Sequence, residues 1–232
     1  MRSHLIAPVL ALIVGSTAAA RANLVIDSFA SGAVTVSATE YGSTDGIELQ
    51  NNLPTAETVG GTRYIRVQSI GDDQDLTPAT ATIDTADQSL RFDSSPSTFG
   101  YLTLTYGSES PLAADLTADG GNRFAIDFSE VDEFSRGLIN LRVMSGNGTL
   151  DTVSFGQEFF AISNSGSSAG RVSVPFAEFN GLDFTDIASV TLDFGRIEAG
   201  QGFTIDRIAV VPEPTTSMLI LAMAATCLYR HR

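Results

Sequence analysis

The chain has 232 residues, a formal net charge of −14 at pH 7, and neither lysine nor tryptophan. Its single cysteine, Cys227, and its two histidines, His4 and His231, lie near the ends of the chain. The long middle part therefore lacks the residues for disulfides, for zinc held by His or Cys, for a Schiff base, and for Ser-His-Asp or Cys-His catalysis. Carboxylate, hydroxyl, arginine and tyrosine chemistry remains.

The N-terminal segment has the pattern of a secretory signal peptide. A short positive start is followed by an apolar run of 10 residues from Leu5 to Val14. This run is too short to span a bilayer, which needs about 20 residues. Small residues follow, and Ala20 and Ala22 match the small-x-small pattern that signal peptidase recognises. We therefore expect cleavage after Ala22, with residues 1–22 as the signal peptide.

Residues 23–211 have the length of one domain and are strongly acidic. They contain 26 Asp and Glu and nine Arg, a formal charge of −17. A nucleic-acid partner is not expected, because such binding needs a basic surface. Divalent cations and neutral or cation-bridged glycans are compatible with this charge. Solubility outside the cell is the simplest reason for the excess of acids.

Apolar and polar residues alternate with a period of two along most of this body. The alternating segments are short, rich in Val, Ile, Thr and Phe, and separated by Gly, Asn, Asp and Ser, which is typical of an antiparallel sandwich or barrel. In chain order, the predicted strands are Leu24–Phe29, Val34–Val36, Tyr64–Val67, Ala81–Asp84, Leu90–Phe92, Tyr101–Tyr106, Phe124–Phe128, Leu141–Val143, Thr149–Phe155, Phe159–Ile162, Arg171–Val174, Val190–Phe194 and Phe203–Val210. A single helical turn is expected at most, over Asp183–Ala188. Asn147-Gly148 favours a type I′ hairpin turn.

Several segments together resemble the jelly-roll sandwich of galactose-binding-like domains and many carbohydrate-binding modules. They are Leu24–Phe29, Val172–Phe176, Phe179–Asp186, Val190–Phe194 and Gly202–Ile208. The resemblance implies an all-β, jelly-roll-like antiparallel β-sandwich in which the first and last strands lie together, and a glycan ligand. Such modules usually present Trp or several Tyr to the sugar, whereas this body has no Trp. Its tyrosines are Tyr41, Tyr64, Tyr101 and Tyr106.

Two groups of carboxylates are candidate sites for a structural Ca²⁺, the only cofactor considered. Asp72, Asp73 and Asp75 form the densest acidic cluster, and Ca²⁺ accepts several oxygen ligands in loose geometry. The EF-hand pattern is incomplete here, so a solvated acidic turn is the simpler interpretation. Asp27 and Asp206 would approach a shared ion if the first and last strands pair. Alternatively, Asp206 caps a turn or pairs with its neighbour.

An enzyme is not expected. A glycosidase needs two carboxylates about 5 to 9 Å apart in a cleft. Among 26 acidic residues some pair meets that distance by chance, and no feature of the sequence selects one.

The chain ends in a short motif, an apolar segment and a basic end. Val211-Pro212-Glu213-Pro214 is followed by an apolar run from Met218 to Tyr229, and then by Arg230 and Arg232. Thr215 to Tyr229 gives 15 residues, which is short for a membrane span of about 20. Thinning of the bilayer and snorkelling of the terminal arginines make up the difference. We expect a transmembrane helix with its arginines on the cytoplasmic side and the body outside.

This order of elements resembles the PEP-CTERM sorting signal of exported proteins from Gram-negative bacteria that make extracellular polysaccharide. The resemblance implies a sorting signal over residues 212–232 and cleavage near its motif by exosortase, a membrane cysteine transpeptidase. The partners would then be the export machinery and exosortase. The protein would be anchored transiently in the inner membrane and then reach the cell surface or the medium. The residues that carry the signal are Val211, Pro212, Glu213, Pro214, Arg230 and Arg232.

The leading functional hypothesis is an exported, non-enzymatic β-sandwich protein of the cell envelope or the extracellular polysaccharide matrix. It would contact a glycan weakly, and tyrosine exposed on one concave sheet would favour this hypothesis. The first alternative is a purely structural or adhesive surface protein. The second is a glycoside hydrolase or lyase that uses only carboxylates, which would require a deep cleft lined by two acids.

Overall fold

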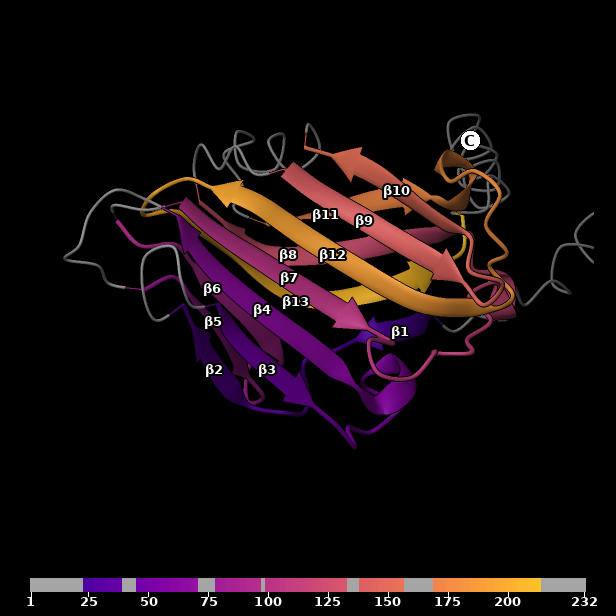
Figure 1. Ribbon diagram of the computed structural model, residues 1–232, viewed down its shortest axis with the longest axis horizontal. Coiled ribbons are helices and arrows are strands. Elements are labelled where there is room, and N and C mark those ends of the chain that lie inside the picture. The colour runs from indigo at the N-terminus through magenta and orange to yellow at the C-terminus, as the bar shows by residue number, and fades with distance from the viewer. Residues whose placement is uncertain are drawn as a thin grey trace, which may run out of the picture.

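The computed structural model describes residues 23–38, 45–70, 78–96, 99–132, 138–156 and 169–213. These residues form two antiparallel sheets that pack face to face (Figure 1), which confirms the prediction of an all-β sandwich. Within these ranges, no helix is long and apolar enough to cross a membrane. The expected signal peptide and most of the expected sorting signal, residues 1–22 and 214–232, lie outside the described residues.

One sheet has seven strands and the other has six. The seven-stranded sheet consists of β1 (Leu24–Asp27), β2 (Val34–Ser37), β5 (Thr80–Asp84), β6 (Ser89–Asp93), β8 (Arg123–Val131), β11 (Gly170–Pro175) and β13 (Gly202–Val211). Its order is β11-β8-β13-β6-β5-β2, and β1 also pairs with β13. The six-stranded sheet consists of β3 (Gly46–Gln50), β4 (Arg63–Ile70), β7 (Phe99–Tyr106), β9 (Leu138–Ser145), β10 (Leu150–Phe155) and β12 (Ile187–Ile197). Its order is β10-β9-β12-β7-β4-β3, and it is the layer nearer the viewer in Figure 1.

The first and last strands lie side by side, as the resemblance to jelly-roll sandwiches implies. Leu24 is opposite Val210 and Val25 is opposite Ala209 in an antiparallel pair. The other end of β13 pairs with β6, and β8 follows β13 along its far side. The chain therefore closes on itself through β13, and the body is held by pairings between segments that are far apart in sequence.

The period-two alternation of the strands produces the core. On β7, for example, Leu102, Leu104 and Tyr106 are buried, and the residues between them face outward. The inward side chains of both sheets form one continuous apolar cluster between the layers. Burying each such side chain contributes about 1.5–3 kcal/mol to the free energy of unfolding.

The sequence prediction missed one strand and suggested one helical turn that does not form. Strand β3 was not predicted, although Ile47 to Gln50 alternate between apolar and polar residues; its burial does not follow the alternation, and Ile47 is exposed. Asp183–Ala188 contains no helix, because the Asp183 carboxylate accepts hydrogen bonds from the N–H and hydroxyl of Thr185, at 3.0 and 2.6 Å. Such local bonds compete with a helix, and β12 begins at Ile187. The predicted strand Phe159–Ile162 lies outside the described residues.

The predicted hairpin at Asn147-Gly148 is present between β9 and β10, but the turn is not of the predicted type I′. A type I′ turn needs positive φ at both central residues, and here Gly148 has φ of 84° whereas Asn147 does not have positive φ. The Gly148 N–H donates to the Ser145 carbonyl at 2.9 Å, and the Asn147 side-chain oxygen accepts the Thr149 N–H at 2.9 Å.

A buried ion pair joins the two sheets. Asp27 ends β1 in the seven-stranded sheet, and Arg63 begins β4 in the six-stranded sheet. Both side chains are 0% exposed. The Arg63 Nε and Nη2 atoms donate to the two carboxylate oxygens of Asp27 at 2.5 and 2.6 Å. The hydroxyl of Tyr106, at the end of β7, donates to the same carboxylate at 2.8 Å.

Neighbouring groups complete this network. The Phe29 N–H donates to Asp27 at 2.9 Å, Arg63 Nη1 donates to Gln50 Oε1 at 2.7 Å, and the guanidinium lies 5.3 Å from the centre of the Phe29 ring. Burial lowers the pKa of Arg63, but the hydrogen bonds and charge of Asp27 outweigh that effect and the pKa is raised overall. Burial, followed by the negative charge of Asp27, raises the pKa of the Tyr106 hydroxyl well above its ordinary value of 10.0.

Replacing Asp27 by alanine should strongly destabilise the fold, because Arg63 would keep a buried charge without its partner. The expected loss in free energy of unfolding is about 3–5 kcal/mol. The exposed Asp206 is the matched control, and Asp206→Ala should change stability by less than about 0.5 kcal/mol. Urea unfolding of the full chain in mild detergent measures both variants. Equal stability of the two variants would contradict this role of the ion pair.

Stability should also fall at high pH because of Tyr106. The folded state holds the phenol proton more tightly than the unfolded state, so the contribution is fully present below pH 10 and is lost as pH rises through the folded pKa. Tyr106→Phe should reduce this loss between pH 9 and 12, while lowering stability by about 1 kcal/mol at pH 7 through the missing hydrogen bond. Urea titrations at several pH values test this. A Tyr106→Phe curve parallel to that of the wild type would count against it.

Candidate functional site

The outward side chains of the six-stranded sheet form rows across four central strands. Arg66 of β4 is opposite Thr103 of β7, Thr103 is opposite Asp193 of β12, and Asp193 is opposite Asn140 of β9. Because alternate residues of a strand face the same side, Gln68 and the other outward residues of these strands share this face. The result is a polar row that crosses the sheet at right angles to its strands.

Hydrogen bonds within the sheet hold this row in place. Asp193 accepts from the Thr103 hydroxyl at 2.8 Å and from Arg142 Nη2 at 3.1 Å. Asp45, just before β3, accepts from Arg66 Nε at 2.6 Å and from Gln68 Nε2 at 2.9 Å. Both carboxylates are therefore occupied by neighbours, while the guanidinium groups keep further N–H donors for a ligand.

Tyr101 lies beside the row, opposite an irregularity in β12. Phe194 pairs with Leu102 and Ile197 pairs with Gly100, so Gly195 and Arg196 together face the single residue Tyr101. This is a β-bulge, and Arg196 within it has φ of 54°. Bulges re-aim side chains and are common beside functional sites. On its other side, Tyr101 is opposite Gln68.

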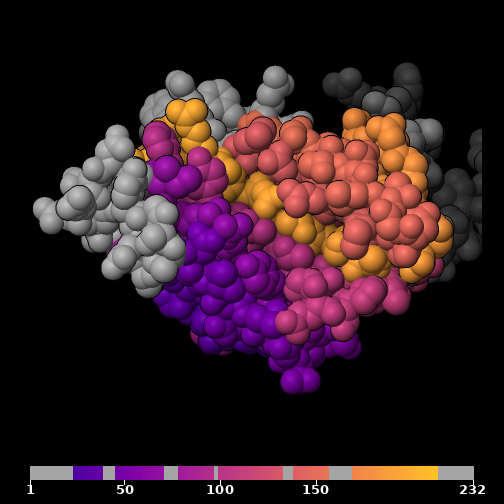
Figure 2. Space-filling view, viewed as in Figure 1, coloured from indigo at the N-terminus to yellow at the C-terminus, as the bar shows by residue number. Residues whose placement is uncertain are grey.

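These side chains line a hollow of about 510 Å³ on the outer face, which is the face that Figure 2 presents. The remaining lining includes Leu138, which is 47% exposed. Ile47, Ile70 and Leu150 are 55%, 49% and 55% exposed, and their register places them on this face too. The large apolar side chains that stand out as exposed among the described residues therefore all gather on one sheet face.

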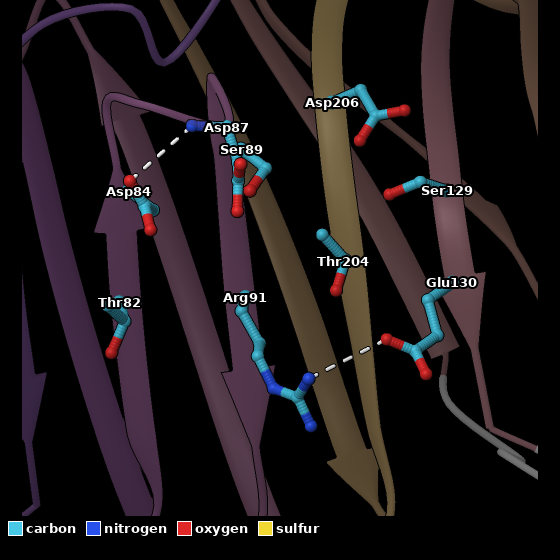
Figure 3. A pocket seen from close by; sticks show the side chains of 9 residues that line it. All are labelled: Thr82, Asp84, Asp87, Ser89, Arg91, Ser129, Glu130, Thr204 and Asp206. Carbon is cyan, nitrogen blue, oxygen red and sulfur yellow. Dashed lines mark hydrogen bonds and ion pairs between the residues drawn. The ribbon is translucent and has the colours of Figure 1, made fainter.

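The seven-stranded sheet carries a second hollow, of about 570 Å³, on its own outer face. Figure 3 shows its carboxylates, hydroxyls and one arginine, which come from β5, β6, β8, β13 and the β5–β6 turn. The lining residues are Thr82, Asp84, Asp87, Ser89, Arg91, Ser129, Glu130, Thr204 and Asp206. None of these described lining residues has an aromatic or large apolar side chain, so they offer no surface for stacking.

Two of these carboxylates already have partners in the fold. Asp84 accepts the backbone N–H groups of Ala86 and Asp87 at 2.8 and 3.4 Å, which shapes the β5–β6 turn. Arg91 Nη1 lies 3.6 Å from Glu130 Oε2 (Figure 3), and Arg91 Nε lies 2.9 Å from Asp93 Oδ2. All the charged groups in these pairs are near or above half exposure, so such pairs contribute little to stability.

The structure does not bring the candidate ion ligands Asp27 and Asp206 together. Asp27 points into the core and is paired with Arg63. The residue opposite Asp27 on β13 is Ile208, which is buried. β13 changes register between Ile205 and Arg207, and this irregularity leaves Asp206 exposed. Within the described ranges, no three Asp, Glu, His or Cys residues group as metal ligands would. The other acidic cluster, Asp72, Asp73 and Asp75, lies outside these ranges.

The start of the expected sorting motif directly follows the last strand. Val211 ends β13 opposite Arg123 of β8. Two residues later, the Glu213 carboxylate lies 3.0 Å from Arg123 Nη2, with the Glu213 side chain 65% exposed. The remaining positions of the sorting and cleavage signals fall outside the described residues; they are Ala20, Ala22, Pro214, Arg230 and Arg232.

Sequence reasoning identified Tyr101 only as one of four tyrosines and did not identify the other residues of its hollow. The available signal was the alternation itself, which assigns the residues between buried ones to one outer face. Arg196 could not be found in this way, because it follows the predicted strand and its orientation depends on the bulge.

Comparison with known proteins gives no family for this chain. No family model and no curated protein matches it. Among solved structures, an exo-β-agarase has 13% identity over 83% of this chain and 25% of its own, with a TM-score of 0.41. A family 11 carbohydrate-binding module from Clostridium thermocellum, in complex with a β-1,3-1,4-mixed-linked tetrasaccharide, has 11% identity over 78% of this chain and 98% of its own, with a TM-score of 0.32.

A family 30 carbohydrate-binding module of a Clostridium thermocellum cellulase has 16% identity over 78% of this chain and 99% of its own, with a TM-score of 0.34. The present chain thus spans only 25% of the agarase but nearly the full length of the two modules. These similarities are weak, and neither the ligands nor the activities of those proteins transfer to this chain on that basis.

Proposed function

We propose that this protein binds a polysaccharide chain across the outer face of the six-stranded sheet. The observation that carries the proposal is the position of Tyr101, between a β-bulge and a row of polar side chains held by their own hydrogen bonds. The exposed apolar side chains of the described residues lie on this same face.

The chemistry of the face suits a sugar chain. The C–H face of a sugar ring packs against the flat ring of a tyrosine, while its hydroxyls bond to amides and guanidinium groups such as Gln68, Asn140 and Arg142, which line the same hollow. From β4 to β9 the hollow crosses three strand spacings, about 14 Å, which accommodates a short stretch of polymer. With one tyrosine in the hollow, the binding is expected to be weak.

We further propose that this function is non-enzymatic. Both carboxylates near the hollow, Asp193 and Asp45, are occupied by neighbouring donors. In this proposal the body is a jelly-roll-like module of an exported protein that its terminal signals carry to the cell surface or the extracellular matrix. A structural or adhesive role with a protein partner remains the first alternative. A carboxylate-only hydrolase or lyase is the second, and it would use the acidic hollow of the other sheet.

Replacing Tyr101 by alanine should weaken polysaccharide binding by about tenfold, because an aromatic anchor at the centre of an interface is typically worth more than 1 kcal/mol. Tyr64→Ala is the matched control, since Tyr64 is on the same face of the neighbouring strand but does not line the hollow. The full chain, in non-ionic detergent, is measured by affinity electrophoresis against soluble β-glucan, galactan and the extracellular polysaccharide of a producing cell, with Ca²⁺ and with chelator.

A second variant tests the hollow without removing the ring. A Cβ at Gly195 would lie 3.9 Å from two Tyr101 ring carbons, an ordinary contact, so Gly195→Val should fold while it crowds the ring and reduces binding. Equal effects of Tyr101→Ala and Tyr64→Ala would contradict the proposed site. Absence of binding to every polymer would favour the adhesive alternative, and the release of new reducing ends would favour the hydrolase.

A separate prediction concerns sorting. Replacing Pro212, Glu213 and Pro214 by alanine should leave the protein at full length in the inner membrane, as measured by cell fractionation and immunoblotting. Arg123→Gln is the control, because it removes the ion pair of Glu213 while it leaves the motif intact. Normal release of the triple variant would refute exosortase-like processing, and trapping of Arg123→Gln would assign the effect to the ion pair instead.

A further inference from the structure

The backbone at Arg196 is strained within the bulge of β12. Within β12, Arg196 has φ of 54° and sits in the two-residue bulge opposite Tyr101. Residues other than glycine rarely adopt this conformation, because their Cβ atom makes it strained. The neighbouring Phe194 and Ile197 are both buried and in register with β7. The bulge therefore lets both apolar side chains reach the core and leaves Arg196 exposed on the outer face.

The side chain of Arg196 is exposed and held in place by an aromatic ring. Its guanidinium carbon lies 5.1 Å from the centre of the Phe99 ring, and Phe99 lies two residues before Tyr101 on β7. Among the described residues, Arg196 forms no ion pair. Arg66 and Arg142, in the same hollow, are each paired with one carboxylate. Arg196 is thus the arginine of this hollow whose positive charge is not balanced by a carboxylate among the described residues.

The two sheet faces have opposite charge. The hollow around Tyr101 is lined by three arginines and one aspartate. With Asp45, which pairs with Arg66 beside it, the formal charge is +1. The hollow on the other sheet is lined by four carboxylates and one arginine, a formal charge of −3. In a chain with a net charge of −14, a basic patch of this kind is a local exception. At physiological salt, charges more than about 8 Å away are largely screened, so a ligand in the hollow responds mainly to the charges beside it. Asp45 and Asp193 pair with Arg66 and Arg142 there, which leaves the charge of Arg196.

We infer that the polysaccharide bound on this face is acidic, with carboxylate or sulfate groups on its sugars. A sugar ring seated on Tyr101 would place its anionic group against Arg196, and Arg142 and Arg66 would flank it. Arginine suits this role because its planar fork donates two parallel hydrogen bonds to such groups. This inference rests on the proposed glycan-binding function and adds the chemical class of the glycan.

The test compares acidic and neutral forms of the same backbone. The full chain, in non-ionic detergent with chelator at 150 mM salt, is measured against polygalacturonate and its methyl ester, and against sulfated carrageenan and unsulfated agarose. We expect tighter binding to the acidic member of at least one pair, and the pair that responds distinguishes carboxylate from sulfate. Chelator excludes bridging by a divalent cation.

Arg196→Gln should reduce affinity for the acidic form by about tenfold, because glutamine cannot make the charge-assisted hydrogen bonds of a guanidinium to the anionic group. Its affinity for the neutral form should not change. Arg91→Gln is the matched control, because it removes one positive charge from the opposite face. Arg142→Gln is a second variant in the hollow, and it keeps the test decisive if Arg196→Gln fails to fold.

The outcomes separate this inference from the proposed function. Equal affinity for acidic and neutral forms, with loss of both in Tyr101→Ala, would overturn the inference and keep glycan binding. Absence of binding to all four polymers would overturn both. Linear polyphosphate serves as a further probe. If it binds as tightly as the acidic glycan and Tyr101→Ala has no effect, the patch is a general anion site, which also overturns the inference.

Discussion

The buried pair of Asp27 and Arg63 is the constraint on which the arrangement of the two sheets depends. Burying two charges costs several kcal/mol, and the loss is recovered only if hydrogen bonds satisfy the remaining donors and acceptors. Here Tyr106, Gln50 and the Phe29 N–H complete the set. The pair connects β1, next to the closing strand β13, with β4 and β7 of the other sheet, so an incorrect docking of the sheets would leave a charge unsatisfied.

The same network sets which residues reach the outer face. A slip of one residue moves every side chain of a strand to the opposite side. Because Arg63 and Tyr106 must point inward to Asp27, the alternate residues of their strands must point outward. These include Arg66 and Gln68 on β4 and Tyr101 on β7, which line the basic hollow. The polar interaction in the core thus determines the composition of the surface proposed to bind glycan.

The alternation of apolar and polar residues was enough to predict the sandwich. The candidate site could not be predicted, because it depends on which strands pair and in what register. A period of two reveals the strands but does not reveal which strands pair. The sequence therefore offers Asp27 only as a candidate ion ligand, whereas its partner in the structure is Arg63, 36 residues away. The pairing of β1 with β13 was correctly predicted, yet the register change in β13 that separates Asp206 from Asp27 leaves no trace in composition. The bulge that orients Arg196 cannot be recognised in the sequence of β12 either, because it is defined by the register of β12 against β7.

The opposite charges of the two faces also bear on how the chain would sit on a polymer. An acidic polysaccharide is repelled by the carboxylates around Asp84 and Asp206 and attracted by the arginines around Tyr101, so only one face is compatible with it. The motif that begins at Val211 leaves from β13, which belongs to the sheet with the acidic face. In the proposed function, the point from which the terminal signal continues and the glycan-binding hollow therefore belong to different sheets of one molecule.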